Sequence, residues 1–437
     1  MSSRILVRCL AFLLGFLSVT PSCILRADTA QPVTPEKPKH TIFNVTEFGA
    51  TGEGKVKDTA SLQKALDACA AAGGGTVLVP PGVYLTGSLQ LKSNTTLSLE
   101  QKAYLVGSPD IEDYPLARVR WEGEFVEGHH GLIWAEQASH IAILGPGSIF
   151  GPPISVSKLR DPRGPALIEP SECTDVLLDG FTAQYQRVWT IHPVLCLGVI
   201  ARNLTIRSVH TNSDGIDVDS CRDVTIERCS IDTGDDAIAL KSGRGLEAVR
   251  AGRPTENVLI KDCILTSSLY AGIGIGTELS GDIRNVRIQN CTITGKGNGI
   301  VIKSRDGRGG VVENITGENL LILNSPTFLS LDLLKRGIQA TEPVPGVVEQ
   351  WTQVRNLRFT GVQVHNVKQL VCATKVPAER PLQGLVLASF TGTCEQGISL
   401  AHATDVALSD IAVTGFQGPL VTTEDVKGTG LNNPTAK

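Results

Sequence analysis

Apolar and polar residues alternate along this chain in segments that are too short for helices. Four segments align with one another and begin 22, 35 and 27 residues apart: Gly215–Ser220, Ala237–Ser242, Gly272–Thr277 and Gly299–Ser304. A second apolar segment follows three of them, at Val224–Ile226, Val258–Ile260 and Val286–Ile288, and a third short one comes after it. Alternation with period 2 is typical of strands, so each repeat predicts three strands and three turns.

One such repeat cannot enclose a core, but stacked repeats can. If each strand pairs with its equivalent in the next repeat, about 4.8 Å away, the apolar positions form one continuous interior. The pattern therefore predicts an all-β chain folded as a parallel β-helix. The alternation places four isoleucines inside the coils (Ile216, Ile238, Ile273, Ile300) and leaves a polar outer wall (Asp217, Asp219, Lys241, Lys303), with Val301 on it and His192 level with Asp217.

Residues 58–72 carry a different period and predict one short helix that caps the N-terminal end of the solenoid. Leu62, Ala65, Leu66 and Cys69 form a single apolar stripe at helical spacing. Asp58 is a residue type that caps helix starts, and the three glycines at 73–75 predict the end of the helix.

The two ends of the chain differ from this repeat. Residues 1–30 resemble a secretory signal, with Arg4 and Arg8 before an apolar core, and residues 31–40 form a Pro-rich linker. We expect a single β-helix catalytic domain over 41–425 and a polar tail over 426–437. The expected location is secreted or periplasmic. No later apolar stretch reaches the length of a membrane span, so no membrane association is expected after the signal is removed.

Composition narrows the possible partners. A formal net charge of −4 offers no basic field for nucleic acid. Of 11 cysteines, nine lie beyond the signal, and their spacing gives no C-x-x-C pair. We interpret Cys221, Cys229, Cys263 and Cys291 as small buried residues and expect no metal and no cofactor. The protein is expected to act as a monomer.

Three aspartates carry the strongest chemical signal. Asp214 and Asp236 occupy the same slot of consecutive repeats, and Asp235 adjoins them in one turn. Stacking brings such residues to about 5 Å, where like charges raise at least one pKa. An acid beside carboxylate partners is what glycoside hydrolysis requires. A calcium site or a solvated acidic turn remain alternative interpretations of the same residues.

Several motifs in order resemble glycoside hydrolase family 28, the polygalacturonases and their relatives. They are, as they stand in this chain, Phe43–Ala50, Val188–Pro193, Asn212–Asp214, Gly234–Asp236, Gly272–Glu278 and Ile302–Gly310. The resemblance covers about residues 41 to 371. It implies a right-handed parallel β-helix and hydrolysis with inversion. It also implies that Asp235 is the general acid, that Asp214 and Asp236 activate water, that Asn212 orients the site, and that Lys303 binds the sugar-acid group.

Two positions depart from the family pattern. Tyr270-Ala271-Gly272 stands where the family has Gly-His-Gly, and Val301 stands where it has an arginine that grips a carboxylate. Arg305 or Arg308 could supply the missing charge, and Tyr270 could stack on a sugar. Trp189 either forms a sugar platform or packs. His192 and Lys241, on the same wall, are further candidates for substrate binding, and Glu278 either pairs with Lys303 or is solvated.

The leading hypothesis is a secreted hydrolase that acts on a pectin-type galacturonan or rhamnogalacturonan, a polysaccharide or oligosaccharide that contains uronate. Two alternatives stay open. A polysaccharide lyase on the same solenoid would release unsaturated products. A non-catalytic carbohydrate-binding solenoid would bind sugar without releasing products.

Overall fold

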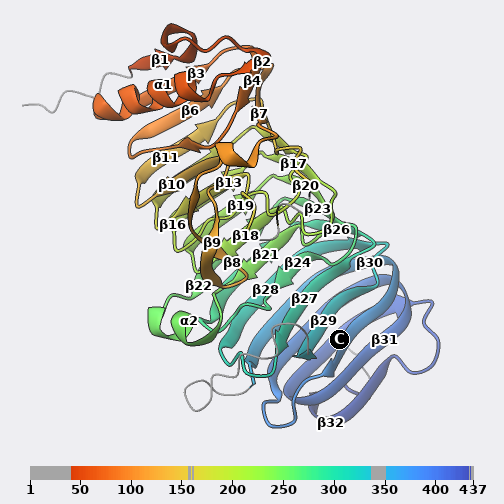
Figure 1. Cartoon of the computed structure of the whole chain (residues 1–437). Coiled ribbons are helices and arrows are strands. Elements are labelled where there is room, and N and C mark those ends of the chain that lie inside the picture. The colour runs from red at the N-terminus through yellow and green to blue at the C-terminus, as the bar shows by residue number, and fades with distance from the viewer. Residues whose placement is uncertain (1–40, 156–158, 160–161, 336–350, 433, 435–437) are drawn as a thin grey trace, which may run out of the picture. The chain divides into compact units, whose positions relative to one another are not determined.

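The computed structural model describes residues 41–155, 159, 162–335, 351–432 and 434. Within them the chain winds through successive coils of three strands. The colour in Figure 1 runs in order from the coils beside α1 to the coils of β31 and β32. Every pairing between coils is parallel, as between Ile216 and Ile238 or between Ile238 and Ile273. The predicted parallel β-helix is confirmed.

The strands form three faces of the solenoid. The first face, which carries the site, consists of β5 (Leu89–Gln90), β10 (Ile133–Glu136), β13 (Ile168–Ser171), β18 (Ile216–Asp219), β21 (Ile238–Lys241), β24 (Ala271–Ile275), β27 (Asn298–Arg305) and β29 (Thr327–Lys335). The second consists of β1 (Ile42–Asn44), β3 (Gly75–Val79), β6 (Thr95–Leu99), β11 (Ser139–Leu144), β14 (Thr174–Asp179), β16 (Leu197–Arg202), β19 (Arg222–Glu227), β22 (Thr255–Lys261) and β25 (Ile283–Gln289). The third consists of β2 (Glu53–Lys57), β4 (Gly82–Thr86), β7 (Ala103–Gly107), β12 (Ser148–Phe150), β15 (Thr182–Gln184), β17 (Thr205–Ser208), β20 (Ser230–Thr233), β23 (Ile264–Ser267) and β26 (Thr292–Gly295).

Longer strands continue across the corners in the last coils. They are β28 (Val311–Leu323), β30 (Gln353–Lys375), β31 (Leu382–Thr414) and β32 (Val421–Thr429). β32 pairs with β31 and runs four residues past position 425, so the solenoid extends into the stretch that the sequence assigns to a polar tail.

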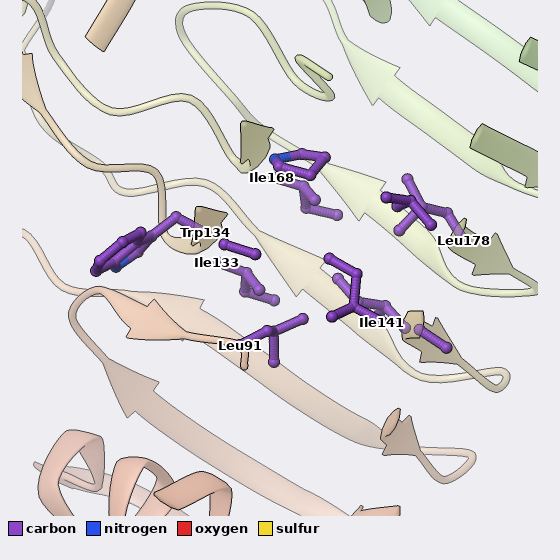
Figure 2. Close-up of a pocket in the computed structure, with 11 residues that line it drawn as sticks. Leu91, Ile133, Trp134, Ile141, Ile168 and Leu178 are labelled. Atoms are coloured by element: carbon purple, nitrogen blue, oxygen red, sulfur yellow. The ribbon is translucent and has the colours of Figure 1, made fainter. Parts of the chain in front are cut away.

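The interior is a stack of identical or similar apolar side chains. Ile216, Ile238, Ile273 and Ile300 pair in register and are almost completely buried, as the alternation predicts. Figure 2 shows the same interior nearer the N-terminal end, where Leu91, Ile133, Ile141 and Ile168 surround an apolar cavity of about 10 Å³. Because the cavity is small and its lining side chains are apolar, it offers a water no hydrogen-bond partners, and we regard it as part of the core.

Asparagines form tight bends near the start of the second-face strands, where the chain arrives from the first face. Asn257, Asn285, Asn314 and Asn356 all have left-handed φ angles near 55–58°, a conformation that asparagine tolerates better than most residues. Their side-chain amides bond from coil to coil, from Asn285 to Asn257 at 3.2 Å and from Asn314 to Asn285 at 3.0 Å. Each turn therefore also ties its coil to the one before it.

The N-terminal helix has the expected position but a different start. α1 (Thr59–Ala71) buries Leu62, Ala65, Leu66 and Cys69, and it ends before Gly73, which has a φ of 87°. The prediction that the Asp58 side chain caps this helix is wrong. Its carboxylate instead accepts hydrogen bonds from the backbone N–H groups of Thr51 and Gly52, at 2.7 and 3.1 Å, because these groups of the preceding loop lie closer.

Besides α1, five elements in the described ranges lie outside the three faces. They are η1 (Val45–Phe48), η2 (Ile111–Asp113), the antiparallel hairpin of β8 (Leu116–Trp121) and β9 (Glu124–His129), and α2 (Gly245–Ala251). Figure 1 shows the hairpin in front of β18 and β21 on the first face. None of the helices in the described ranges is both long and apolar enough to cross a bilayer.

The cysteines pack as the sequence predicts. Cys221, Cys229, Cys263 and Cys291 are buried, and each cysteine in the described ranges is a free thiol. The proposed signal and linker, residues 1–40, lie outside the described residues.

Candidate active site

Three carboxylates meet where strands of the first face begin. Asp214 precedes β18, and Asp235 and Asp236 precede β21 in the next coil. The backbone N–H of Gly215 bonds to the carbonyl of Asp236 at 3.0 Å, which puts Asp214 and Asp236 in register. One oxygen from each of the three side chains lies within 4.8 Å of the others. The predicted stacking of these aspartates is confirmed as geometry.

The turn that holds Asp235 is fixed by its own polar groups. The Thr233 and Ser267 hydroxyls donate to the Asp235 carbonyl at 2.9 and 2.7 Å. The Asp235 carboxylate accepts the backbone N–H of Asp236 at 2.8 Å. Gly234 is required here, because a Cβ at this position would lie 1.9 Å from the carbonyl oxygen of His210. The carboxyl group therefore has one defined direction at the mouth of the site.

Glycine also makes room for Asp236. A Cβ on Gly274 would lie 2.2 Å from Asp236 Oδ2, so the carboxylate rests directly on the bare backbone of β24. Lys303 of β27 reaches the same oxygen, with Nζ at 2.6 Å. The glycines at 272 and 274 thus belong to a strand that a carboxylate lies against, and Gly276 follows its end, so they do not form a nucleotide-binding loop.

Asp214 and Asp235 both have raised pKa values. Burial, followed by the charges of Asp217 and Asp235, raises the pKa of Asp214 well above its usual range. Burial and the neighbouring Asp236 raise the pKa of Asp235 to about 6. Asp235 is only half-buried, whereas Asp214 and Asp236 are buried. The exposed member of the cluster is therefore the one that can carry a proton towards a ligand near neutral pH.

The cluster is a poor calcium site. Calcium takes six to eight oxygen ligands, and these side chains offer three within reach of one point. The ammonium of Lys303 already lies at ion-pair distance from Asp236. The arrangement suits acid–base chemistry better than cation binding.

Two of the other predicted residues, Tyr270 and Asn212, are at least partly exposed near the cluster. Tyr270 is 46% exposed, and the Lys303 ammonium lies 5.9 Å from its ring centroid. Asn212 is half-buried in the turn before Asp214, with a φ of 69°. Tyr270 therefore lies near Lys303, the cation that pairs with Asp236. Val301, which stands where the family has arginine, is buried beside Lys303 on the same strand.

Four other candidates for substrate binding are buried within the wall. Trp189 is 4% exposed and stacks on Trp121 with ring centroids 3.9 Å apart, so it packs rather than offering an open platform. His192 is 1% exposed, and its Nδ1 lies 3.6 Å from Glu169 Oε1. Lys241 and Arg305 are each 5% exposed.

Some contacts around the site were not predicted from the sequence. Glu278 pairs with Lys241 at 3.5 Å, and not with Lys303. The hairpin of β8 and β9 docks on the wall through Arg120, whose Nε lies 3.2 Å from Asp219 Oδ2 and whose Nη1 lies 3.0 Å from Glu247 Oε1. Alternation placed Asp219 on the outer wall, but no repeat marks residues 116–129, so the sequence carried no signal for their position.

A solenoid with three aspartates clustered on its outer wall offers the acid–base pairing that a glycoside hydrolase requires. Comparison with known proteins gives the family. The chain belongs to the glycosyl hydrolases family 28, whose model matches residues 69–389. It is a polygalacturonase-like glycoside hydrolase, and the resemblance found in the sequence is confirmed.

Relatives and solved structures agree with this assignment. A "Probable polygalacturonase" from Vitis vinifera is 32% identical over 374 residues, which cover 82% of this chain and 74% of the relative. The "hyperthermoactive Exopolygalacturonase from Thermotoga maritima" has a TM-score of 0.71 at 26% identity and covers 91% of this chain and 93% of its own. The Yersinia enterocolitica "Family 28 Exopolygalacturonase" has a TM-score of 0.80 at 21% identity and covers 89% and 78% of the two chains. Against two further relatives the match spans 61% and 57% of their length.

Proposed function

We propose that this protein is an exported enzyme that hydrolyses glycosidic bonds of galacturonan, the polyuronate backbone of pectin. The observation that carries the proposal is the cluster of Asp214, Asp235 and Asp236 with Lys303 2.6 Å from Asp236. The names of the relatives, which include polygalacturonases, support a galacturonan substrate.

In this proposal the proton moves between three carboxyl groups and one water. Asp235, protonated below its raised pKa, donates its proton to the glycosidic oxygen as the bond from that oxygen to the anomeric carbon breaks. Asp214 and Asp236 hold a water, whose oxygen attacks the anomeric carbon while its proton passes to a carboxylate. No covalent intermediate with the protein is required.

Direct attack by water inverts the anomeric centre. This outcome follows from the family resemblance and not from the spacing of the carboxylates. In many inverting enzymes the two carboxyl groups are about 6.5–9.5 Å apart, whereas the three side chains here have oxygens within 4.8 Å of one another. The anomer formed first, read by proton NMR, distinguishes inversion from a covalent intermediate.

Lys303, which lies beside the cluster and near the Tyr270 ring, is the cation that we propose binds the sugar-acid group. Arg305 and Arg308 follow on the same strand and its turn. Export is proposed on the signal-like residues 1–30, which predict a location outside the cytoplasm, in the periplasm or the medium.

The test is a digestion of polygalacturonate, rhamnogalacturonan and a neutral glucan, with products identified by mass. We expect saturated galacturonate products from the first substrate and none from the glucan. Unsaturated products would indicate a lyase, and sugar binding without products would indicate a binding solenoid. Cleavage of rhamnogalacturonan but not of polygalacturonate would mean that rhamnogalacturonan, and not galacturonan, is the substrate class.

A further inference from the structure

Three aromatic side chains from successive coils form a strip on the outside of the third face. Tyr104 lies on β7, Phe150 on β12, and Tyr185 directly after β15. The Tyr104 and Phe150 ring centroids are 5.9 Å apart, and the Phe150 and Tyr185 rings stack at 5.9 Å with an interplanar angle of 22°. Tyr185 is 58% exposed, and the other two side chains are half-buried. We call these three residues the aromatic strip.

Tyr185 stands at a position whose backbone favours a smaller residue. Its φ of 58° is in the left-handed region, which bulky residues rarely adopt, and the second-face bends use asparagine there, as at Asn257 and Asn285. The tyrosine therefore costs the fold some backbone strain, while more than half of its surface faces solvent. Exposed apolar groups of this kind, rimmed by polar residues, mark binding surfaces.

An arginine adjoins the aromatic strip in the next coil. Arg207 pairs in register with Gln184, and the backbone N–H of Tyr185 donates to the Arg207 carbonyl at 3.0 Å. The guanidinium lies 3.7 Å from Asp232, and its side chain is 68% exposed, so this weak surface pair leaves it accessible to a second anion. Aromatic faces accept the C–H faces of sugar rings, and a guanidinium accepts a carboxylate, which together match a polyuronate.

The aromatic strip is continuous with the active site along one edge of the solenoid. Gln184, Arg207 and Asp232 pair in register in three successive coils. Tyr185 follows the first of them by one residue, and Asp235 follows the third by three. Two coil steps of about 4.8 Å therefore separate Tyr185 from the turn of Asp235 along the solenoid.

The hairpin of β8 and β9 closes the other route. It covers the first face in the coil before Asp214, where Trp121 stacks on Trp189 with centroids 3.9 Å apart. It also covers the end of β18, where Arg120 pairs with Asp219 at 3.2 Å. A polymer that extends from the aspartate cluster towards the N-terminal coils is therefore directed along the edge with the third face and not over the first face.

We propose that the aromatic strip and Arg207 form a secondary binding site that holds a galacturonan chain outside the active site, with sugar faces on the rings and a uronate carboxylate on the guanidinium. The identity of the polymer rests on the proposed function. Because one chain can occupy both sites, the aromatic strip adds affinity only for substrates that are long enough to reach it.

The test uses Tyr185→Asn, Arg207→Gln and the double variant. Asparagine removes the ring and tolerates the left-handed φ. In the double variant the KM for polygalacturonate should rise about three- to tenfold with kcat unchanged. The KM for trigalacturonate should stay near its wild-type value, because a trimer cleaved at Asp235 extends at most two sugars towards the aromatic strip.

Two exposed residues of the second face provide matched controls. Ile200 is an apolar residue that is 40% exposed. Arg222 lies 3.8 Å from Glu256 with its side chain 55% exposed, much as Arg207 does beside its own partner. Ile200→Ala and Arg222→Gln should leave both KM values unchanged.

Binding is also measured without catalysis, in the Asp235→Asn background, by mobility in native gels that contain polygalacturonate, relative to gels without polymer. The double variant should be retarded less than its parent, and hydroxyethylcellulose, a neutral glucan, should retard neither. Equal retardation of the two proteins by polygalacturonate, or a KM that rises equally for polymer and trimer, would overturn the proposal. A wild type that cleaved no polygalacturonate would refute the proposed function, while the gels still decided whether the aromatic strip binds the polymer.

Discussion

Asp235 differs from its two partners in what surrounds it. It is half-buried at the mouth of the cluster, whereas Asp214 and Asp236 are buried against the wall. Burial and the adjacent Asp236 raise its pKa to about 6, and Lys303 and Lys241 partly offset this effect. A proton can therefore be held at Asp235 under conditions where an exposed aspartate would have lost it.

The rate should follow the protonation of Asp235. The protonated form is the general acid, so kcat/KM should fall as pH rises through about 6, by tenfold for each further pH unit. Initial rates on polygalacturonate between pH 4 and 9 provide the measurement, with the folded state checked by circular dichroism at each pH. A rate that stays flat from pH 6 to 8 would contradict the assignment of Asp235.

Gly274 should be intolerant of even one methyl group. Its φ is not left-handed, so alanine is acceptable to the backbone, but the new Cβ would lie 2.2 Å from Asp236 Oδ2. The carboxylate must then move away from Lys303. We expect Gly274→Ala to lower kcat at least tenfold while the melting temperature changes little. A Gly274→Ala enzyme with wild-type kcat would show that Asp236 does not need this position.

At the scale of elements, a buried ion pair helps to anchor the hairpin of β8 and β9 on the wall. The side chains of Arg120 and Asp219 are 2% and 0% exposed. Removing one partner of such a pair leaves an uncompensated buried charge, which costs about 3–5 kcal/mol. Arg120→Ala should therefore lower the free energy of unfolding by about that amount, measured with urea.

Arg118→Ala is the control for this loss. Arg118 lies on the same strand and contacts the Phe125 ring at 4.7 Å, a contact worth about 1 kcal/mol or less. Arg120→Ala/Asp219→Asn should recover part of the stability, because the second change neutralises the orphaned carboxylate. A double variant as unstable as Arg120→Ala would mean that the loss is one of packing and not of charge.

Sequence and structure agree most closely where a repeat exists. Ile238 and Ile273 could be placed inside the coils because alternation fixes the face of a strand, and Asp214 could be placed beside Asp236 because they share a slot in the repeat. The hairpin and the partner of Glu278 could not be predicted, because contacts between a non-repeating segment and the wall leave no period in the sequence. The prediction that the Asp58 side chain caps α1 was wrong because its carboxylate instead accepts hydrogen bonds from the backbone of the loop at Thr51 and Gly52.

At the scale of the whole molecule, buried acids make stability depend on pH. Burial raises the pKa of Asp217 to about 7. A group with a raised folded-state pKa contributes stability that is fully present below its unfolded pKa of about 4 and is lost as pH rises through the folded value. Asp217 should therefore favour folding less at pH 8 than at pH 4.

A comparison of wild type with Asp217→Asn isolates the effect of Asp217 from that of other groups. Glu278, for example, has a pKa lowered to about 2, so its contribution to stability has the opposite pH dependence. As pH rises from 4 to 8, the unfolding free energy of wild type should fall relative to that of Asp217→Asn. Urea midpoints at both pH values measure it. A difference that is constant across this range would mean that Asp217 titrates alike in the folded and unfolded chains.

The stacked coils have one further consequence for the whole molecule. The active site is assembled from turns and strands of several coils, from Asp214 to Lys303, and each coil contacts mainly its neighbours. The catalytic residues therefore come together only when these coils stack, and no single repeat could carry the chemistry.

The most direct test of the account compares wild type, Asp235→Asn and Asp232→Asn in hydrolysis of polygalacturonate at pH 5. Asp232 lies in the strand that leads to the same turn but pairs with Arg207 and is 41% exposed. Loss of a general acid typically costs a factor of about 10² to 10⁴ in rate. The account predicts that loss for Asp235→Asn, with an unchanged fold by circular dichroism and wild-type activity for Asp232→Asn. A folded Asp235→Asn enzyme that hydrolyses the polymer at the wild-type rate would contradict it.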